Sequence, residues 1–375
     1  MQKHTQIAVI GAGIVGLSIA RAEALKGHQV TVFERDSRAV GATIRNFGMI
    51  WPIGQAVGPA LDRALRTRAI WGDFTKESGL WHNAEGSLHL AYHEDELAVL
   101  EAFGESVGAS YQCKLLSAKE AINLSPATKP KGLLGALWSG TEMIVDPREV
   151  PATLAQYLQE TLGVNFKFGT AVTDISESFL SASGERWTFE RAWLCGGSDF
   201  ETLFAETFAN SGLNKVKLQM MRTLPQPEDW KMGPALAAGL TLTHYASFAH
   251  CQAELAQLKS RIKEKSPWFE QWGIHVMMSQ NGKRELILGD SHEYGSVHDP
   301  FVREDINQYI LDYLFGFAQA PDWRLAERWY GVYAKLPGQT EYVSRPLPNV
   351  RIVTGLSGAG MTLSFGLGEE LVRAL

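Results

Sequence analysis

Three glycines near the start of the chain have the spacing of a turn that binds phosphate through its backbone. Gly11, Gly13 and Gly16 follow the apolar run 7–10 and begin a segment whose apolar residues recur at helical spacing. In such a turn the first glycine permits the tight bend, the second lets the backbone approach a diphosphate, and the third lets helix and strand pack closely. The diphosphate would lie at the helix N-terminus, where free N–H groups and the helix dipole attract negative charge.

An acidic residue stands where such a turn needs one. The run 28–34 has the character of a second strand and ends at Glu34, about 20 residues after the glycines. A carboxylate at this position accepts hydrogen bonds from the ribose of a dinucleotide. Strand, glycine turn, helix, strand and acid occur in this order, which predicts dinucleotide binding. FAD and NAD satisfy the pattern equally.

The last part of the chain separates these two nucleotides. Gly355, Gly358 and Gly360 stand between the predicted strand 350–353 and a predicted helix that contains Glu369 and Glu370. FAD lies extended, and we expect both of its ends to be held. A second helix N-terminus behind a glycine turn meets this need, whereas a simple NAD dehydrogenase does not require it. The C-terminal turn therefore favours FAD.

The elements that position these groups differ in kind along the chain. Nucleotide-type strands and glycines occur at the start, in the middle and at the end, whereas alternating apolar and polar residues dominate from 215 to about 327. Such alternation predicts antiparallel strands with one covered face. Helices are predicted at 60–78, 93–108, 117–123, 145–163, 253–265 and 302–317, and further strands at 86–92, 132–138, 164–175, 186–197, 215–223, 239–248, 274–280 and 285–291.

Composition and charge limit the classes of function. The 375 residues are 45% hydrophobic and carry a formal net charge of −6 without a block of lysine or arginine, so we expect two domains and no nucleic-acid partner. Cys113, Cys195 and Cys251 show neither metal-binding spacing nor a paired pattern, so we predict no metal site and no disulfide framework. The apolar run 7–20 is too short for membrane insertion, and no secretory leader pattern precedes it, so we expect a cytoplasmic protein.

Four motifs follow one another over nearly the whole chain. They are "VIGAGIVG…VFER" at 9–35, "GATIRNFGM" at 41–49, "RAWLCGG" at 191–197 and "GLSGAGMTLSFGLGEEL" at 355–371. Their order and spacing resemble the D-amino-acid oxidase / glycine oxidase / sarcosine oxidase superfamily of FAD enzymes. The resemblance implies an α/β fold with a discontinuous Rossmann-like FAD-binding domain and a substrate domain built on a mixed, largely antiparallel β-sheet. The implied FAD-binding domain comprises 1–80, 143–215 and 328–375, and the implied substrate-binding domain comprises 81–142 and 216–327.

The resemblance also implies which residues surround the FAD. Glu34 would bind the adenosine ribose, Arg35 would lie on the adenine side, and Val172 would meet adenine through its backbone. The segment 358–363 would cover the ribityl chain and the flavin, and it contains no cysteine, so FAD should be held non-covalently. The implied cofactor-binding residues are Gly11, Gly13, Ile14, Val15, Gly16, Glu34, Arg35, Ala42, Thr43, Arg45, Asn46, Phe47, Gly48, Val172, Gly196, Gly197, Gly355, Gly358, Ala359, Gly360, Met361, Thr362 and Leu363.

The expected substrate clamp departs from the family pattern. Glycine and D-amino-acid oxidases usually have an arginine just after a Trp-x-Gly motif, and it grips the substrate carboxylate. Here the motif at 329–331 is followed by Tyr333 near that position and by Lys335. A lysine provides a point charge rather than a bidentate fork. This difference favours a rounder anion such as a phosphonate, helped by histidine and tyrosine donors, although Lys335 could also be a solvated loop residue.

Several residues in or near the predicted flavin loop each have two possible roles. Arg45 would contact flavin or substrate, or it would form a surface ion pair. Met49 and Trp51 would wall the substrate pocket, or they would belong to the core. Cys195 is expected to be a small packing residue rather than a redox group.

The histidines of the middle segment are weaker candidates for the substrate pocket. His244 and Tyr245 lie in the predicted strand 239–248, where neighbouring side chains point to opposite faces, so at most one of them should reach the pocket. His275 and His292 could equally be core or surface histidines. We include His244, Tyr245 and His275 with Met49, Trp51, Tyr333 and Lys335 in the predicted substrate-binding set.

The resemblance implies an enzyme that oxidises a small anionic amine to an imine by hydride transfer to flavin N5, with no residue assigned as catalytic base. The segments 45–55, 240–248, 273–280 and 289–295 resemble a branch associated with aminophosphonate breakdown, which favours 2-aminoethylphosphonate or an N-alkyl derivative. The alternatives are an N-methyl or D-amino-acid oxidase or dehydrogenase, and a non-catalytic FAD-bearing subunit of a larger complex. Ile287 stands where sarcosine oxidases carry a lysine, so the electron acceptor could be O2 or another molecule. The sequence does not define the oligomeric state.

Overall fold

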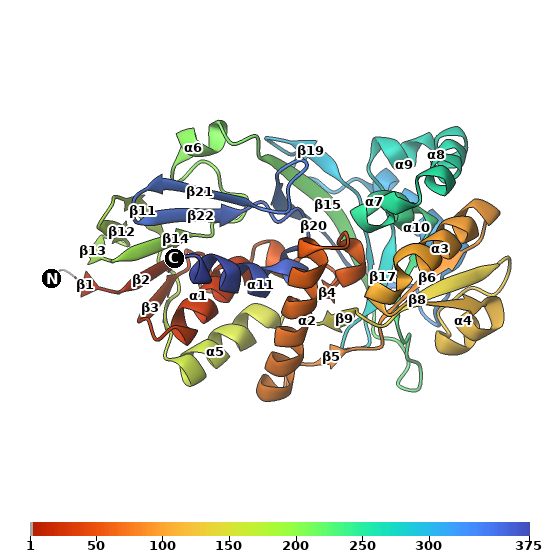
Figure 1. Cartoon of the computed structure of the whole chain (residues 1–375), viewed down its shortest axis with the longest axis horizontal. Helices are drawn as coiled ribbons and strands as arrows, with labels where there is room; N and C mark the ends of the chain where they lie inside the picture. The colour runs from red at the N-terminus through yellow and green to blue at the C-terminus, as the bar shows by residue number, and fades with distance from the viewer. Residues whose placement is uncertain (1–2) are drawn as a thin grey trace.

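The opening glycine turn belongs to a six-stranded sheet in the computed structural model, which describes residues 3–375 (Figure 1). The strand order is β10-β3-β2-β14-β22-β21, and all neighbours are parallel except β21 and β22. All residues of β2 are buried, as expected for a parallel strand that is covered on both faces. The strands are β2 (Ile7–Ile10), β3 (Val30–Phe33), β10 (Asn165–Lys167), β14 (Arg191–Leu194), β21 (Tyr342–Leu347) and β22 (Val350–Thr354).

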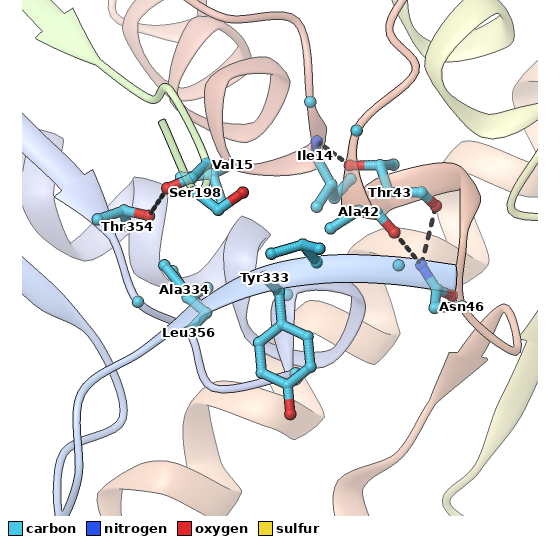
Figure 2. Close-up of a pocket in the computed structure, with 18 of the residues that line it drawn as sticks. Ile14, Val15, Ala42, Thr43, Asn46, Ser198, Tyr333, Ala334, Thr354 and Leu356 are labelled. Atoms are coloured by element: carbon cyan, nitrogen blue, oxygen red, sulfur yellow. Dashed lines mark hydrogen bonds between the residues drawn. The ribbon is translucent and has the colours of Figure 1, made fainter. Parts of the chain in front are cut away.

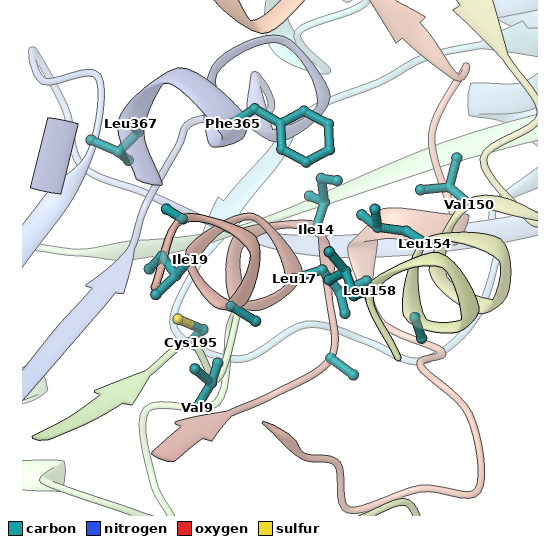
Figure 3. Packing of buried hydrophobic residues seen from close by; sticks show 14 of the residues in the cluster. Val9, Ile14, Leu17, Ile19, Val150, Leu154, Leu158, Cys195, Phe365 and Leu367 are labelled. Carbon is teal, nitrogen blue, oxygen red and sulfur yellow. The ribbon is translucent and has the colours of Figure 1, made fainter. Parts of the chain in front are cut away.

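Different layers cover the two faces of this sheet. Ile7 and Val9 pack in a cluster with helical residues, whereas Ala8 and Ile10 pack in a cluster with Trp187 of a second sheet. Figure 3 shows the helical side, where α1 packs between α5 and α11. The helices of this layer are α1 (Ile14–Leu25), α2 (Pro59–Ser78), α5 (Val150–Leu162) and α11 (Gly360–Arg373), and the second sheet comprises β1 (Lys3–His4), β11 (Val172–Ile175), β12 (Phe179–Ala182) and β13 (Glu185–Thr188).

A nine-stranded mixed sheet forms the other large unit. Its path is β19-β15-β18-β17-β16-β6-β8-β7, with β20 paired to β15, and the pairs are antiparallel apart from β16 with β6. The predicted α/β fold with a largely antiparallel second sheet is therefore confirmed. The strands are β6 (Ser87–Ala91), β7 (Lys114–Ser117), β8 (Gly135–Ser139), β15 (Asn214–Thr223), β16 (Ala235–Ala238), β17 (Met277–Gln280), β18 (Leu286–Gly289), β19 (Glu293–Gly295) and β20 (Leu325–Lys335).

Helices gather around the nine-stranded sheet at the end of the molecule opposite the N-terminus (Figure 1). Residues of α10 pack with one face of the sheet, and residues of α3 and α8 belong to the cluster on the other face. The remaining helices are α3 (Glu94–Val107), α4 (Ala118–Leu124), α6 (Ala205–Ala209), α7 (Gly239–His244), α8 (Gln252–Lys265), α9 (Pro267–Gln271) and α10 (Glu304–Phe317). Within residues 3–375, no helix is both long enough and apolar enough to cross a membrane.

The predicted strand 239–248 was wrong, because this segment forms α7 and a 3-10 helix at Ala246–His250. Gly239, Leu240 and two further residues are buried in succession, which alternation in a strand would not give. Gly239 also has to be small, because an added Cβ would lie 2.2 Å from the Glu96 carboxylate. Short apolar runs do not distinguish strand from buried helix, so tertiary packing decided the outcome.

A small sheet connects the two large units. It has the order β4-β9-β5, with β4 (Met49–Ile50), β5 (His82–Asn83) and β9 (Met143–Val145). The predicted boundary at 328 falls within β20, which joins the nine-stranded sheet, and the boundary at 215 falls within β15. The division into an FAD-binding and a substrate-binding domain stays a prediction.

Candidate functional site

One cavity of about 1030 Å³ runs between the two large units. It is as large as the upper end of the usual range for ligand sites, about 300–1,000 Å³. Gly16 and Gly48 are the predicted site residues that lie outside its lining. The predicted residues that line it are Gly11, Gly13, Ile14, Val15, Glu34, Arg35, Ala42, Thr43, Arg45, Asn46, Phe47, Met49, Trp51, Val172, Gly196, Gly197, His244, Tyr245, His275, Tyr333, Lys335, Gly355, Gly358, Ala359, Gly360, Met361, Thr362 and Leu363.

The glycine end of the cavity, which we define by Gly11, Gly13, Ile14, Glu34 and Val172, depends on close backbone packing. Gly11 has φ +105°, and an added Cβ would lie 2.4 Å from the Cys195 carbonyl oxygen. Gly16 approaches the same turn from the helix, because its Cβ would lie 1.9 Å from the Gly11 carbonyl oxygen. Gly16 therefore shapes the turn from behind, without lining the cavity.

The N-terminus of α1 faces this end of the cavity. Gly13 is its N-cap, and the Ile14 N–H donates to Thr43 Oγ1 at 2.9 Å, as Figure 2 shows. Thr43 thus uses one of the free N–H groups that a helix start provides. Val15 lies beside it in the cavity wall. The other N–H groups at this helix start and the helix dipole still favour an anion here.

Glu34 is anchored by the backbone at the end of β3. Its carboxylate accepts from the Ala12 N–H at 2.9 Å and from the Asp36 N–H at 3.1 Å. Carboxylate oxygens have further lone pairs, so these bonds orient Glu34 without saturating it. Arg35, the next residue, is held by a side chain instead of the backbone: its guanidinium forms an ion pair with Asp199 at 2.5 Å.

The loop 41–49 is held in place by its own polar groups. The Asn46 side chain donates to the carbonyl oxygens of Ala42 and Thr43 (Figure 2). It also accepts from the Gly48 N–H. The expectation that Gly48 borders the cofactor is wrong, because this residue lies behind the loop. Its φ is +74°, and an added Cβ would lie 2.0 Å from the Val145 carbonyl oxygen. Gly48 is needed where the loop crosses β9.

The C-terminal turn lies beside the opening turn. An added Cβ at Gly360 would lie 3.5 Å from Ile14 Cγ2, so α11 and α1 begin next to each other. The two helix N-termini therefore face neighbouring parts of the cavity, and the expectation that the second helix holds the flavin end of an extended nucleotide stays a prediction. Thr354 ties the turn to the middle segment by donating to the Gly197 carbonyl oxygen at 2.7 Å (Figure 2).

Tyr333 lies between the C-terminal turn and the other end of the cavity. An added Cβ at Gly358 would lie 3.5 Å from the Tyr333 hydroxyl, and the centre of the Tyr333 ring is 6.4 Å from that of His292. In Figure 2 this ring points away from Ile14 and Thr43. Lys335 follows on the same strand, half-buried, with its ammonium 3.1 Å from the Tyr294 hydroxyl.

Three histidines meet at this second end. The ring centres of His244 and His275 are 3.9 Å apart, and His292 lies 5.0 Å from His244 and 5.3 Å from His275. We call His244, His275 and His292 the histidine cluster, and the part of the cavity that they line with Tyr245 and Tyr333 the histidine end. The expectation that at most one of His244 and Tyr245 reaches the pocket is wrong, because Tyr245 leaves the end of α7 rather than a strand.

Burial keeps the ionisable groups of the histidine end neutral. It lowers the pKa of His292 to about 4, against a bond to Gly273 that raises it. It also places the pKa of His275 well below the usual value, with His244, His292 and Lys335 lowering it further. For His244, which is open to the cavity, desolvation within the cavity and the charges of His292 and Lys335 act in the same direction.

The prediction of the substrate-binding set did not include Asp290 and His292, which both line the cavity. They lie just beyond β18, where the sequence reads "GDSH". A polar run directly after an apolar strand is a weak signal, and nothing in it shows that His244 and His275 come to the same place. Ile287, in contrast, is buried in a hydrophobic cluster.

Comparison with known proteins places the chain among flavoenzymes. The family model described as "FAD dependent oxidoreductase" matches residues 6–374. The D-amino acid dehydrogenase of Helicobacter pylori (strain ATCC 700392 / 26695) is 26% identical over 98% of this chain and 94% of its own length. The glycine oxidase of Geobacillus kaustophilus (strain HTA426) is 25% identical over 53% of this chain and 56% of its own length. The chain spans only about half or less of the length of the first curated relatives that it matches. For the glycerol 3-phosphate dehydrogenase of Caloramator mitchellensis, the match covers 36% of that protein's length.

Solved structures share the fold over the whole chain. The glycine oxidase structure from Geobacillus kaustophilus has a TM-score of 0.75 at 18% identity and covers 100% of this chain and 94% of its own. The L-proline dehydrogenase from P. horikoshii has a TM-score of 0.77 at 20% identity, with 100% and 93% covered. At these identities the likeness concerns the fold alone.

The residues present fit an FAD molecule. The cavity has the volume for a large ligand, two helix N-termini lie next to each other in its wall, and the Glu34 carboxylate is fixed at the end of the second strand. Backbone donors with a helix dipole suit the diphosphate, and a carboxylate suits the ribose hydroxyls.

Proposed function

This chain belongs to the FAD-dependent oxidoreductase family, and from that premise we propose that it oxidises a small anionic amine to an imine. Bound FAD would supply the hydride acceptor for the carbon next to the substrate nitrogen. The protein's task is then to hold that carbon in place, to bind the anionic group and to exclude water. No side chain is assigned as a catalytic base.

The proposed cofactor contacts are those of the glycine end and of the C-terminal turn. The start of α1 would face the diphosphate, Glu34 the ribose, and Val172 the adenine. The start of α11 would meet the ribityl and flavin part, with Arg45 and the loop 41–47 on the other side. We propose that FAD is held non-covalently, because Cys195 points into the core beside Val9 and Ile19 (Figure 3) and no cysteine occurs in 355–375.

The single observation behind the substrate proposal is the donor set of the histidine end. Tyr333 takes the place of the arginine clamp implied by the resemblance, and Lys335 provides a charge nearby. His244, His275, Tyr245 and Tyr333 also line this part of the cavity, so imidazole and phenol groups are available as donors to a bound anion. Such an arrangement suits a tetrahedral oxyanion better than a flat carboxylate, which favours an aminophosphonate such as 2-aminoethylphosphonate or its N-methyl form.

The names of the relatives favour a second candidate. Glycine oxidase and D-amino acid dehydrogenase are among them, so an N-alkyl glycine or a D-amino acid is the alternative substrate. Arg45 is the guanidinium in the flavin loop that could take over the carboxylate. It lies against β20, with its Nη1 3.4 Å from the Tyr330 carbonyl oxygen.

An anaerobic substrate panel tests both candidates without assuming an electron acceptor. The purified yellow protein is mixed with 2-aminoethylphosphonate, N-methyl-2-aminoethylphosphonate, glycine, sarcosine, D-alanine and glycerol 3-phosphate, and flavin bleaching is followed. Bleaching by the aminophosphonates alone supports the proposal. Bleaching by sarcosine, glycine or D-alanine selects the alternative, and bleaching by none of them leaves a non-catalytic FAD-bearing subunit. Reoxidation by air compared with a dye then identifies the class of acceptor.

A further inference from the structure

We propose that His244, His275, His292 and Asp290 form a site for one divalent transition-metal ion, with zinc as the ion that suits these ligands. The three histidines each offer a ring nitrogen, and these atoms all lie within 4.8 Å of one another. Asp290 is next to them, with Oδ1 3.4 Å from His275 Nε2 and Oδ2 4.0 Å from His292 Nε2. The inference concerns metal binding and does not depend on the proposed substrate.

The hydrogen bonds of His292 prepare it as a ligand. Its Nδ1 is 2.9 Å from the Gly273 carbonyl oxygen, which can only accept, so Nδ1 carries the proton. In the neutral ring Nε2 then presents its lone pair, and this is the nitrogen on the side of Asp290. A backbone carbonyl that fixes the tautomer of a histidine is the usual support behind a metal ligand.

Two polar atoms of the cluster have no hydrogen-bond partner within residues 3–375. His275 Nδ1 and Asp290 Oδ1 are buried and make no hydrogen bond there, although their residues are only 4% and 5% exposed. Buried polar groups of this kind are rare unless an ion, a water or a ligand completes them. Asp290 Oδ1 lies on the side of His275 Nε2, and an ion between these two side chains would complete the carboxylate oxygen.

Asp290 adds a carboxylate ligand to the three imidazoles. The ion pairs of Asp290 within the described chain are with His275 and His292, and no lysine or arginine there lies within 4.0 Å of it. A divalent ion at this place would supply the positive charge that a buried carboxylate needs.

Three histidine nitrogens and one carboxylate oxygen match the ligands and number of a tetrahedral zinc site. Bonds of about 2.0–2.1 Å would bring neighbouring ligand atoms to roughly 3.3 Å, so the side chains must close in by up to about 1.5 Å. The ion would join the end of α7, the loop before β17 and the loop after β18 into one rigid wall of the cavity. These segments are distant in sequence, which explains why no metal motif is visible there.

Metal uptake by untagged protein tests this inference. Flavin-loaded protein is stripped with a chelator, equilibrated with Zn²⁺ and desalted, and the bound metal is measured by mass spectrometry. Co²⁺ serves as the spectroscopic probe, because its tetrahedral complexes absorb at longer wavelength than the flavin. We expect one ion per chain in the wild type, and at least about 10-fold weaker binding in His292→Asn and His275→Asn, since ligand supports alone are worth about 10–100-fold.

The control is His250→Asn, because His250 is exposed at the end of its 3-10 helix and outside the cavity lining. It should bind metal like the wild type. His244→Asn covers the case in which the buried variants fail to fold, because His244 is open to the cavity. Equal uptake by the wild type and His244→Asn, or no uptake by the wild type, would overturn the metal site. Metal uptake is measured without substrate and flavin bleaching with it, so failure of the metal site and failure of the proposed function are distinguishable.

Discussion

The glycine end and the histidine end of the cavity are built in opposite ways. At the glycine end, backbone groups and glycines with close contacts form the surface, and Gly11 tolerates no Cβ because the Cys195 carbonyl is in the way. At the histidine end, side chains from α7, β20 and the loops around β17 and β18 form the surface. The first end is determined by local geometry, and the second by how distant segments pack.

This difference explains the two kinds of function that we assign. A backbone turn with a helix N-terminus suits any nucleotide diphosphate, so it identifies the cofactor class and nothing about the substrate. Side chains such as Lys335 and the histidine cluster can change without disturbing that turn. They therefore carry the specificity, and the four variants below test the separation from the largest expected effect to the smallest.

The largest effect is expected at the glycine end. Gly11→Ala introduces a Cβ 2.4 Å from a carbonyl oxygen at φ +105°, so the turn has to move. We expect retained flavin per chain to fall by more than about 10-fold and the free energy of unfolding by more than about 2 kcal/mol. Flavin absorbance after gel filtration and urea unfolding measure the two quantities. Gly27→Ala is the matched control, since Gly27 has φ +84° but open space around its Cβ, and it should cost about 1 kcal/mol while retaining flavin.

A change at the histidine end should alter substrate binding alone. Lys335→Met removes the charge near Tyr333, and we expect the dissociation constant of the best anionic amine to rise about 10–100-fold, the usual value of a hydrogen bond to a charged group. Anaerobic stopped-flow flavin reduction gives this constant. Tyr294→Phe, which removes only the hydroxyl that contacts Lys335, is the control and should behave like the wild type. Loss of flavin in Lys335→Met would contradict the separation of the two ends.

The nine-stranded unit should respond to acid before the glycine end does. Burial lowers the pKa of His89 on β6 to about 3, whereas an ordinary histidine has 6.5. Between these values the unfolded chain binds a proton that the folded chain does not, so stability falls as the pH drops. One such group contributes a slope of about 1.4 kcal/mol per pH unit below about pH 6.

His89→Gln should lower this slope by about 1.4 kcal/mol per pH unit, the share of one group, and the exposed His82→Gln should leave it unchanged. Urea unfolding at pH 7, 6 and 5 measures the slope, with flavin release reporting the glycine end. An identical slope in the wild type and His89→Gln would show that this histidine does not contribute.

The smallest effect is expected where the C-terminal turn meets the middle segment. Thr354→Val keeps the shape of the side chain but removes the bond to the Gly197 carbonyl oxygen. The free energy of unfolding should fall by about 1 kcal/mol, the net value of one hydrogen bond. Thermal unfolding with bound flavin checks this, and Thr354→Ser, which keeps the hydroxyl, should stay closer to the wild type. A larger effect of Thr354→Ser than of Thr354→Val would remove the hydrogen bond as the explanation.

Sequence reasoning performed differently at the two ends. Gly11, Gly13 and Glu34 could be located from the sequence because a strand, a turn and a helix follow one another within one short segment, and local spacing fixes their geometry. The place of Gly48 was misjudged, because a contact with β9 rather than the loop's own sequence requires that glycine. The segment 239–248 was misjudged because its apolar pattern fits a buried helix as well as a strand.

The amino-acid sequence by itself determined the dinucleotide turn, the acid that follows it, the α/β class and the family, since all of these rest on short-range patterns. Only the tertiary structure decided that α11 begins beside α1, and that His244, His275, His292 and Asp290 meet in one wall. The physical reason is that spacing along the chain fixes positions only within one element or turn. Contacts between distant elements depend on how whole layers pack, and no local pattern encodes them.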